Sequence, residues 1–443
     1  MRLKLPPKVK YIIELLEMQG FEAYAVGGCV RDTVLMRTPQ DWDITTSARP
    51  EQIKEVFHRT VDTGIQHGTV TVLVGDEGFE VTTYRIDGEY LDGRHPKEVI
   101  FTPSLEEDLL RRDFTINAMA YNDRTGLVDL YGGMNDLQRK RIRCVGKADD
   151  RFDEDALRIL RAVRFSAQLG FQMDDETRES VAAHAENLRK ISAERIQAEI
   201  LKLISSPHPE KWLDLYELGI TAVIMPEFDV CMETPQNTPY HFYNVGEHTV
   251  RAMCAIRADK DLRLAVLFHD LAKPVVRFSD STGRDHFAGH APKGAGIAEE
   301  IMRRLKMDNR TIRKVSSLVR THELRPDPDP SLVRKTIHLV TPELFPDYLE
   351  IQRADNAAKS RYGQLDTEVR VDPVEACYRE IISRGDPLTL KELVIGGRDL
   401  TELGISGKAV GDILKECLME VLEDPAANSR ERLLSFAKML KEQ

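Results

Sequence analysis

The stretch VGGCVRDTVLMRTPQDWDITTS, Val26 to Ser47, contains a glycine pair, an Arg-Asp pair and two aspartates that flank a tryptophan. Asp41 and Asp43 are two residues apart, and alternate side chains of an extended chain point to the same face. Two carboxylates so close together repel one another, so we expect the pair to bind a divalent cation or to have a shifted pKa. The alternative is an ordinary turn before a strand, because aspartate is common in turns.

The composition is typical of a folded, water-soluble protein with two or more domains. The chain has 443 residues, of which 42% are hydrophobic and 30% charged. It has no run of 18 apolar residues, and its start does not resemble a secretion signal, so we expect no membrane partner. The six cysteines are scattered and form no CxxC pair, which argues against disulfides or a zinc-cysteine site and favours the cytoplasm.

The net charge of −11 does not by itself favour a nucleic-acid partner, but the basic residues are clustered. Residues 138–147 carry five cations and no acid, and residues 303–320 carry seven cations and one acid. Either run is a candidate contact with an RNA backbone or a simple solvated face.

The spacing of apolar residues predicts a mixed α/β part followed by a helical part. An amphipathic helix is predicted over residues 8–19, and short strand-like runs come after it, with a helix at 50–57 between them. This α/β part ends near Gly133. From about Phe152 the sequence has long segments with the 3.6-residue period of helices.

The glycines and acids of the first part together indicate nucleotidyl transfer. Gly27 and Gly28 permit a tight turn whose backbone amides can approach a phosphate. Glu80 lies in the apolar run FEVTTYR, as expected for a central strand, and is a third acid beside Asp41 and Asp43. Carboxylates on adjacent strands suit two Mg²⁺ ions, one activating a hydroxyl and the other neutralising a triphosphate. We therefore predict Asp41 and Asp43 as catalytic Mg²⁺ ligands and Glu80 as a further ligand.

Five motifs in this order resemble one enzyme family. They are GGCVRDTVLMRTPQDWDITT, EEDLLRRDFTINAMAY (106–121), DLYGGMNDLQRKRIRCVG (129–146), RFDEDALRILRAVRFSAQLGF (151–171) and ISAERIQAEILKLI (191–204). Together they resemble the class II tRNA nucleotidyltransferases, which include the bacterial CCA-adding enzymes and their poly(A) polymerase relatives. The resemblance implies an α+β head of the DNA polymerase beta type, then a mostly α-helical neck, body and tail. It also implies template-independent addition of CCA to the tRNA 3′ end from CTP and ATP.

The resemblance further implies nucleotide-binding roles. Arg31 and the glycine turn would hold the triphosphate. Arg111 and Arg112 would meet phosphates, and Asp113 and Asn117 would hydrogen-bond a ribose hydroxyl.

Residues in the fourth motif are implied to select the base. Asp155 and Arg158 are three residues apart, which predicts that they share one helical face and can read the Watson–Crick edge of a base. Arg161 extends this stripe, and Glu154 can brace Arg158. The spacing alone is equally typical of a surface ion pair.

The segment 85–108, centred on YLDGRHP, helps to indicate which nucleotides this family member adds. CCA-adding members have a flexible loop here, and members that add only CC lack it. The segment therefore favours CCA or A addition, and the poly(A) polymerase alternative stays open.

The helical part contains a second set of metal-ligand residue types. Their order H…HD…H…H…D resembles the HD phosphohydrolase superfamily, in which helices gather His and Asp around one or two divalent metals. Neutral imidazoles and carboxylates suit Mn, Fe, Ni, Zn or Mg. The candidate ligands are His248, His269, Asp270, His290, His322 and Asp355. His286 fits no motif position. In relatives with such a domain the implied activities are phosphatase and 2′,3′-cyclic phosphodiesterase.

We expect four parts: a catalytic head at 1–134, a base-selecting neck at 135–205, a body at 206–360 and a tRNA-binding tail at 361–443. The body would contain an all-α HD domain at about 240–360. The rival hypothesis is an HD-type phosphohydrolase that uses its head only to bind nucleotide or RNA.

Overall fold

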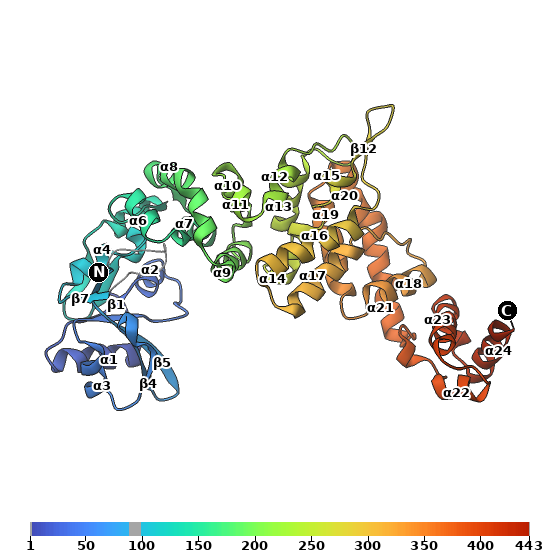
Figure 1. Ribbon diagram of the computed structural model, residues 1–443, viewed down its shortest axis with the longest axis horizontal. Helices are drawn as coiled ribbons and strands as arrows, with labels where there is room; N and C mark the ends of the chain where they lie inside the picture. Colours follow the sequence, from blue (N-terminus) through green and yellow to red (C-terminus); the bar gives the residue numbers. More distant parts are fainter. Residues whose placement is uncertain (1, 88–98, 443) are drawn as a thin grey trace. The chain divides into compact units, whose positions relative to one another are not determined.

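A seven-stranded mixed sheet forms the centre of the first part of the chain, in a computed structural model that describes residues 2–87 and 99–442 (Figure 1). The strand order is β3-β4-β5-β2-β1-β8-β9, and only β2 and β5 run parallel. Their bounds are β1 Ala23–Val26, β2 Ile44–Thr46, β3 Thr60–Gly64, β4 Thr69–Val74, β5 Glu77–Thr83, β8 Met119–Asn122 and β9 Gly126–Asp129.

The predicted helices of this part are present. Helix α1 (Pro7–Met18) buries Val9, Ile12, Ile13 and Leu16, whose spacing of three and four residues places them on one helical face. Helix α3 (Pro50–Val56) begins at a proline, whose missing N–H costs nothing at a helix start. Shorter elements lie between the strands of the sheet or directly after its last strand: α2 Gly28–Val34, β6 Arg85–Asp87, β7 Val99–Phe101, α4 Leu105–Leu110 and α5 Gly133–Arg139.

The register of β2 against β5 brings two predicted acids side by side. Ile44 pairs with Val81, so Asp43 and Glu80, the preceding residues of these parallel segments, are neighbours. Asp41 and Asp43 lie just before β2 rather than within it. The stretch YLDGRHP at residues 90–96 lies outside the described residues.

The chain divides into two units, Met1–Ile224 and Met225–Gln443. After the sheet the first unit is helical, apart from the short pair β10 (Arg141–Ile142) and β11 (Gln172–Met173). Its remaining helices are α6 Ala148–Glu154, α7 Leu157–Leu169, α8 Asp175–His184, α9 Ala193–Ile204, α10 Trp212–Glu217 and α11 Thr221–Ile224. The sheet and these helices confirm the predicted α+β head followed by helices.

The second unit is almost entirely helical. Helix α13 packs on α14 and α19, and α17 packs on α14 and α16 (Figure 1). The helices near its centre are α12 Pro226–Met232, α13 Val245–Ala255, α14 Lys260–Phe268, α15 Lys273–Val276, α16 His290–Arg304, α17 Asn309–Thr321 and α19 Phe345–Ala357. The others are α18 Pro330–Val340, α20 Arg361–Asp366, α21 Asp372–Arg384, α22 Gly397–Glu402, α23 Lys408–Glu423 and α24 Arg430–Lys441, with the strand pair β12 Phe278–Ser279 and β13 Asp285–His286.

Within residues 2–87 and 99–442, every helix is too short or too polar to cross a bilayer. The four-part division of the chain stays a prediction.

Candidate functional site

The glycine turn lies directly beside the acids of the first unit. Gly27 has φ +80°, a conformation that glycine adopts without the steric cost of a Cβ. Its amide donates a hydrogen bond to the Met119 carbonyl oxygen at 3.1 Å. A Cβ at Gly27 would lie 3.1 Å from Nη1 of Arg112, so the turn and this guanidinium are close together. The amide of Val26 donates to the Asp43 carbonyl oxygen at 3.0 Å, which fixes the turn against the segment that carries the acids.

Asp41, Asp43 and Glu80 are exposed residues, and the charges of Asp41 and Glu80 act on the Asp43 carboxylate. Partial desolvation raises the pKa of Asp43, and the negative charges of Glu80 and Asp41 add to this rise against the opposing charge of Arg112. Such mutual repulsion is relieved by a cation with oxygen ligands. Elsewhere, the described residues contain groups of possible metal ligands whose ligand atoms all lie within 4.8 Å of one another. The carboxylate oxygens of Asp41, Asp43 and Glu80 are not such a group.

A buried network connects the other predicted nucleotide-binding residues. Arg31 Nη1 donates to Asn117 Oδ1 at 2.7 Å, and Asn117 Nδ2 donates to Asp113 Oδ1 at 3.2 Å. Arg161 donates to Asp113 Oδ2 from Nε and Nη2, at 2.8 and 2.6 Å. Burial alone would raise the pKa of Asp113, but Arg161 holds it well below the usual range. Residues from the sheet region and from α7 are thereby fixed relative to one another.

Arg111 and Arg112 contact a carboxylate that was absent from the sequence prediction. Asp108 is fully buried and accepts from Arg111 at 2.8 Å, from Arg112 at 3.3 Å and from the Thr45 hydroxyl at 3.1 Å. Burial opposes its ionisation, but the two guanidinium groups lower the pKa of Asp108. Asp108 precedes Arg111 by three residues and Arg112 by four, and this helical spacing could have indicated that it pairs with both arginines.

The prediction that Asp155 and Arg158 share one helical face is wrong. Helix α6 ends at Glu154 and α7 begins at Leu157, so Asp155 lies in the break, with φ −144°. Its Oδ1 accepts from the Leu157 amide at 3.0 Å, a local hydrogen bond that competes with helix continuation. Its Oδ2 accepts from Arg195 at 2.6 Å. Asp155 therefore lies between α6 and α7, whereas Arg158 lies in the first turn of α7.

Arg158 is braced as predicted. Glu154 accepts from Arg158 Nη1 at 2.5 Å, and the Arg111 carbonyl oxygen accepts from Arg158 Nη2 at 3.0 Å. The residue is buried, with 8% of its surface exposed. These bonds fix the guanidinium beside the segment that carries Arg111 and Arg112.

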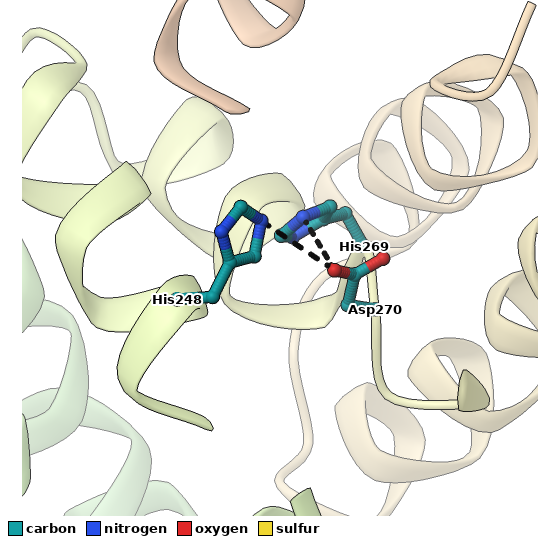
Figure 2. Close-up of side chains that lie close together, drawn as sticks. All are labelled: His248, His269 and Asp270. Carbon is teal, nitrogen blue, oxygen red and sulfur yellow. Dashed lines mark ion pairs between the residues drawn. The ribbon is translucent and has the colours of Figure 1, made fainter. Parts of the chain in front are cut away.

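The second unit brings its six predicted ligands together. His248 and His269 come from α13 and the end of α14, and their rings point toward the Asp270 carboxylate (Figure 2). His248 Nε2 lies 3.0 Å from Asp355 Oδ1, and His269 Nε2 lies 3.1 Å from Asp270 Oδ2. The Nε2 atoms of His290 and His322 are 3.0 Å apart and face Asp270 Oδ1, at 3.3 and 3.8 Å. All six side chains are buried.

The backbone orients three of these imidazoles for metal binding. His269, His290 and His322 each direct Nδ1 at a carbonyl oxygen, at 2.6, 2.8 and 2.7 Å. A carbonyl only accepts, so Nδ1 carries a proton and Nε2 is the nitrogen that faces the centre and can bind a metal through its lone pair.

The charges at this centre favour a cation. His269 Nε2 and Asp270 Oδ2 are buried 3.1 Å apart, and Lys273 Nζ is the other charged group beside this oxygen, at 2.7 Å. Burial would lower the pKa of His269, but Asp270 and Asp355 raise it to about 9. Burial lowers the pKa of His322 to about 4, so this ring is neutral at pH 7. The described residues contain two tight groups of possible ligands: His248, His269 and Asp270, and Asp270, His290 and His322. The residues therefore fit a divalent metal.

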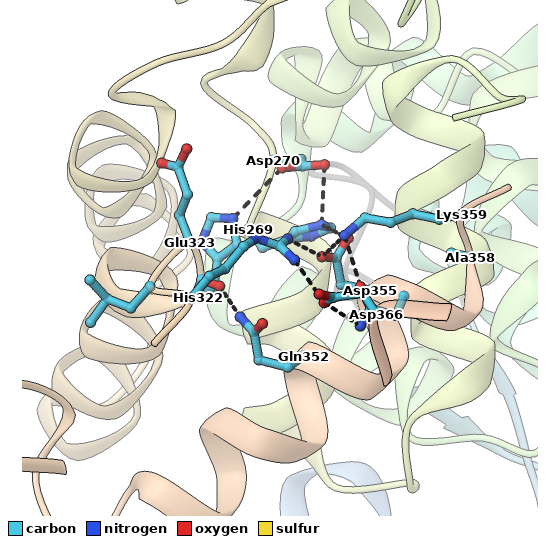
Figure 3. Close-up of polar contacts among 12 residues, drawn as sticks. His269, Asp270, His322, Glu323, Gln352, Asp355, Ala358, Lys359 and Asp366 are labelled. Atoms are coloured by element: carbon cyan, nitrogen blue, oxygen red, sulfur yellow. Dashed lines mark hydrogen bonds and ion pairs between the residues drawn. The ribbon is translucent and has the colours of Figure 1, made fainter. Parts of the chain in front are cut away.

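Further polar contacts position the acids of this centre (Figure 3). Lys273 Nζ lies 2.7 Å from Asp270, and Lys359 Nζ lies 2.5 Å from Asp355. Gln352 donates to the His322 carbonyl oxygen. A cavity of about 560 Å³ opens onto the centre, with His286 on its lining.

His241, which the motif did not indicate, also faces the centre, with its ring 5.0 Å from that of His248. Burial lowers the pKa of His241 to about 2, and Lys273 and His248 add to the effect. It lies in a loop outside the helical pattern, so no sequence signal could have identified it.

Comparison with known proteins identifies the family of this chain. Three family models match: "Poly A polymerase head domain" over residues 23–143, "Probable RNA and SrmB-binding site of polymerase A" over 170–232, and "tRNA nucleotidyltransferase domain 2 putative" over 294–437. A CCA-adding enzyme of Lactiplantibacillus plantarum is 33% identical over 97% of this chain and 95% of its own length. The chain belongs to the CCA-adding enzyme family.

Other family members match in part or in structure. A CCA-adding enzyme of Lactobacillus delbrueckii is 54% identical over 43% of this chain, and the match spans about half of that relative, 48%. The Bacillus stearothermophilus CCA-adding enzyme, solved in complex with CTP, is 29% identical, with a TM-score of 0.75 over 99% of this chain and 98% of the other. The fold shared with this CCA-adding enzyme extends through both units.

Proposed function

We propose that this protein adds C, C and A to the 3′ end of tRNA, with CTP and ATP as substrates. The observation that carries the proposal is the similarity to CCA-adding enzymes over nearly the whole chain. The adjacent positions of Asp43 and Glu80 beside the Gly27 turn support it.

In this proposal the tRNA 3′ hydroxyl attacks the α-phosphorus of the nucleotide and pyrophosphate leaves. Asp41, Asp43 and Glu80 would hold Mg²⁺, which when bound lowers the pKa of the hydroxyl and neutralises the triphosphate. The raised pKa of Asp43 and the all-oxygen ligand set support this assignment. The Gly27–Gly28 amides and Arg112 would orient the triphosphate, because they lie together beside the acids.

The buried network would fix the ribose and base subsites. Asp113 and Asn117, which Arg31 and Arg161 hold in place, would bind the ribose hydroxyl. Asp155 and Arg158 at the α6–α7 junction would select the base. The basic runs 138–147 and 303–320 and the tail 361–443 are proposed tRNA contacts, and the expected location is the cytoplasm.

A direct assay tests the activity. Purified protein is given tRNA that ends before CCA, with CTP alone, ATP alone or both, and product lengths are read from a sequencing gel. We expect two added residues with CTP alone and three with both nucleotides. Long A tracts with ATP alone would instead support a poly(A) polymerase, and single A addition to tRNA ending in CC alone would support an A-adding enzyme.

Replacing Arg158 by alanine is expected to reduce the preference between C and A. The guanidinium supplies hydrogen-bond donors, and one well-oriented polar contact contributes discrimination of about 1–3 kcal/mol, roughly 5- to 150-fold. The measurement is the ratio of kcat/KM for CTP and ATP on matched tRNA ends. Metal dependence should stay unchanged. Unaltered base choice in a folded Arg158→Ala protein would refute the selecting role.

A second candidate function belongs to the His/Asp centre of the second unit. The gathering of four histidines and two aspartates supports a divalent-metal phosphohydrolase. His248, His269, Asp270, His290, His322 and Asp355 would hold the metal, which when bound activates a water for attack on phosphorus. The rival hypothesis, in which this is the sole activity and the head only binds nucleotide or RNA, predicts no tRNA extension with any combination of CTP and ATP.

A further inference from the structure

The side chain of Phe165, on α7, lies among three arginines of the first unit. The residue is buried, with 5% of its surface exposed. The guanidinium carbons of Arg164, Arg31 and Arg161 lie over its ring, at 3.7, 5.1 and 5.3 Å from the centroid. A cation within about 6 Å of the face of an aromatic ring is attracted by the ring quadrupole. Two of these arginines, Arg31 and Arg161, belong to the buried network that contains Asp113.

Each of the three guanidinium groups has a carboxylate partner. The pairs are Arg31 with Asp32 at 2.8 Å, Arg161 with Asp113 at 2.6 Å and Arg164 with Glu199 of α9 at 2.5 Å. Without these partners, three positive charges around one ring would repel one another. The three ion pairs therefore allow the arginines to gather at an uncharged ring whose faces carry partial negative charge.

The ring and its nearest arginine are held in place by buried neighbours. Phe114, which is fully buried, packs edge-to-face on Phe165, with ring centroids 5.7 Å apart and an interplanar angle of 80°. Arg164 and Glu199 are buried in their side chains, and Arg164 Nη1 also donates to Gln168 Oε1 at 2.7 Å. The position of the Phe165 ring is thus determined by contacts that lie outside the proposed ribose site.

Arg31 and Arg161 hold the proposed ribose-binding pair from its two ends. Arg31 Nη1 donates to Asn117 Oδ1 at 2.7 Å, and Arg161 Nη2 donates to Asp113 Oδ2 at 2.6 Å. Asn117 Nδ2 and Asp113 Oδ1 join the two halves at 3.2 Å. This chain of hydrogen bonds begins and ends at a guanidinium group beside Phe165, so a change at the ring would displace both ends.

Selection of the sugar depends on how accurately this pair is placed. Asp113 and Asn117 are 8% and 6% exposed. A site whose buried polar groups hydrogen-bond a substrate hydroxyl disfavours an analogue without that hydroxyl, because those groups then lose a partner. A displacement of about 1 Å is enough to weaken such an interaction strongly.

We infer that Phe165 is a positioning residue for sugar selection: its ring holds Arg31 and Arg161, and through them Asn117 and Asp113, in the arrangement that favours a ribonucleotide over a deoxyribonucleotide. This inference rests on the proposed nucleotide addition and on the proposed ribose contacts of Asp113 and Asn117. Phe165 acts only through the two arginines. The faces of its ring, and not only its volume, are therefore required.

Replacing Phe165 by leucine tests the inference, because leucine is apolar but has no ring quadrupole. The measurement is single-turnover addition to tRNA that ends before CCA, with CTP and with dCTP. We expect the ratio of kcat/KM for CTP to that for dCTP to fall about tenfold in Phe165→Leu, the size expected for the loss of buried cation–π contacts. An equal loss with both nucleotides would show a packing role alone and would overturn the inference.

Fluorinated rings keep the size of the side chain nearly constant and cover the case in which Phe165→Leu does not fold. Phe165 is replaced site-specifically by 4-fluorophenylalanine and by 3,4,5-trifluorophenylalanine, which weaken the negative ring faces in steps. The CTP/dCTP ratio should fall in the same order, while thermal unfolding stays close to that of the wild type. A wild-type ratio in the trifluoro protein would overturn the inference.

A matched control and the wild type separate the possible failures. Phe152→Leu alters another fully buried phenylalanine of the first unit, on α6, whose ring neighbours His184 at 6.3 Å. It should retain the wild-type CTP/dCTP ratio, and a fall equal to that of Phe165→Leu would overturn the inference. Absence of tRNA extension by the wild type with CTP would contradict the proposed function itself. Equal use of CTP and dCTP by an active wild type would overturn the inference about Phe165 alone.

Discussion

Replacing Asp41 by alanine is expected to abolish nucleotide addition and leave folding and tRNA binding intact. Asp41 is exposed and lies before β2, outside the core, so its removal should change stability by no more than about 0.5 kcal/mol. In the transition state, however, its carboxylate would help hold the charge that neutralises the triphosphate. Loss of one such stabilising group costs roughly 10²- to 10³-fold or more in rate.

The measurement is single-turnover CMP incorporation into tRNA that ends before CCA, with tRNA binding followed by fluorescence anisotropy. Asp76→Ala provides the control, because Asp76 is an exposed acid in the turn between β4 and β5 of the same sheet. We expect Asp76→Ala to transfer at the wild-type rate. If Asp41→Ala did the same, the assignment of the head as the catalytic site would fail.

The sequence predicted correctly which residues lie close together, but it was less accurate about the helices and strands that contain them. The resemblance of the His and Asp order to the HD superfamily implied the ligands of the His/Asp centre, and the adjacent His-Asp pair in an apolar run favoured buried partners. Glu80 was predicted with Asp41 and Asp43 as an acid on an adjacent strand, and the observed register of β2 against β5 brings it beside Asp43. Both predictions used short stretches of sequence and needed no knowledge of long-range contacts.

Elements with a local competitor or a distant partner escaped this reasoning. A continuous apolar period predicted one helix through Asp155, but the Asp155 carboxylate accepts from the Leu157 amide and the helix breaks there. Asp108 is buried beneath Arg111 and Arg112, where its role depends on the Thr45 hydroxyl 63 residues away. The rings of Tyr240 and Tyr362 are 5.2 Å apart, although more than a hundred residues separate them in the chain. Their contact depends on the close packing of Gly363 against the Tyr240 backbone.

Replacing His269 by alanine is expected to abolish the divalent-metal binding proposed for the second unit without stopping nucleotide addition. His269 Nε2 is a buried atom 3.1 Å from Asp270 and 3.8 Å from Asp355, and the carbonyl of Val266 fixes its ring. Loss of a partner that only orients a ligand reduces metal affinity by about 10- to 100-fold, so loss of the ligand itself should cost at least about 100-fold.

The measurements are Mn²⁺ titration calorimetry, release of phosphate from a phosphate ester and tRNA extension, all on the same preparations. His286→Ala is the matched control, because His286 lies on the rim of the same cavity, 48% exposed in its side chain and paired with Asp280. It should bind Mn²⁺ as the wild type does. Since a buried alanine leaves a cavity, Asp355→Asn supplies a near-isosteric second test, and thermal unfolding reports whether each variant folds. Equal Mn²⁺ affinity of folded His269→Ala, Asp355→Asn and His286→Ala would contradict the metal centre. Loss of tRNA extension in these folded variants would instead mean that the second unit takes part in nucleotide addition.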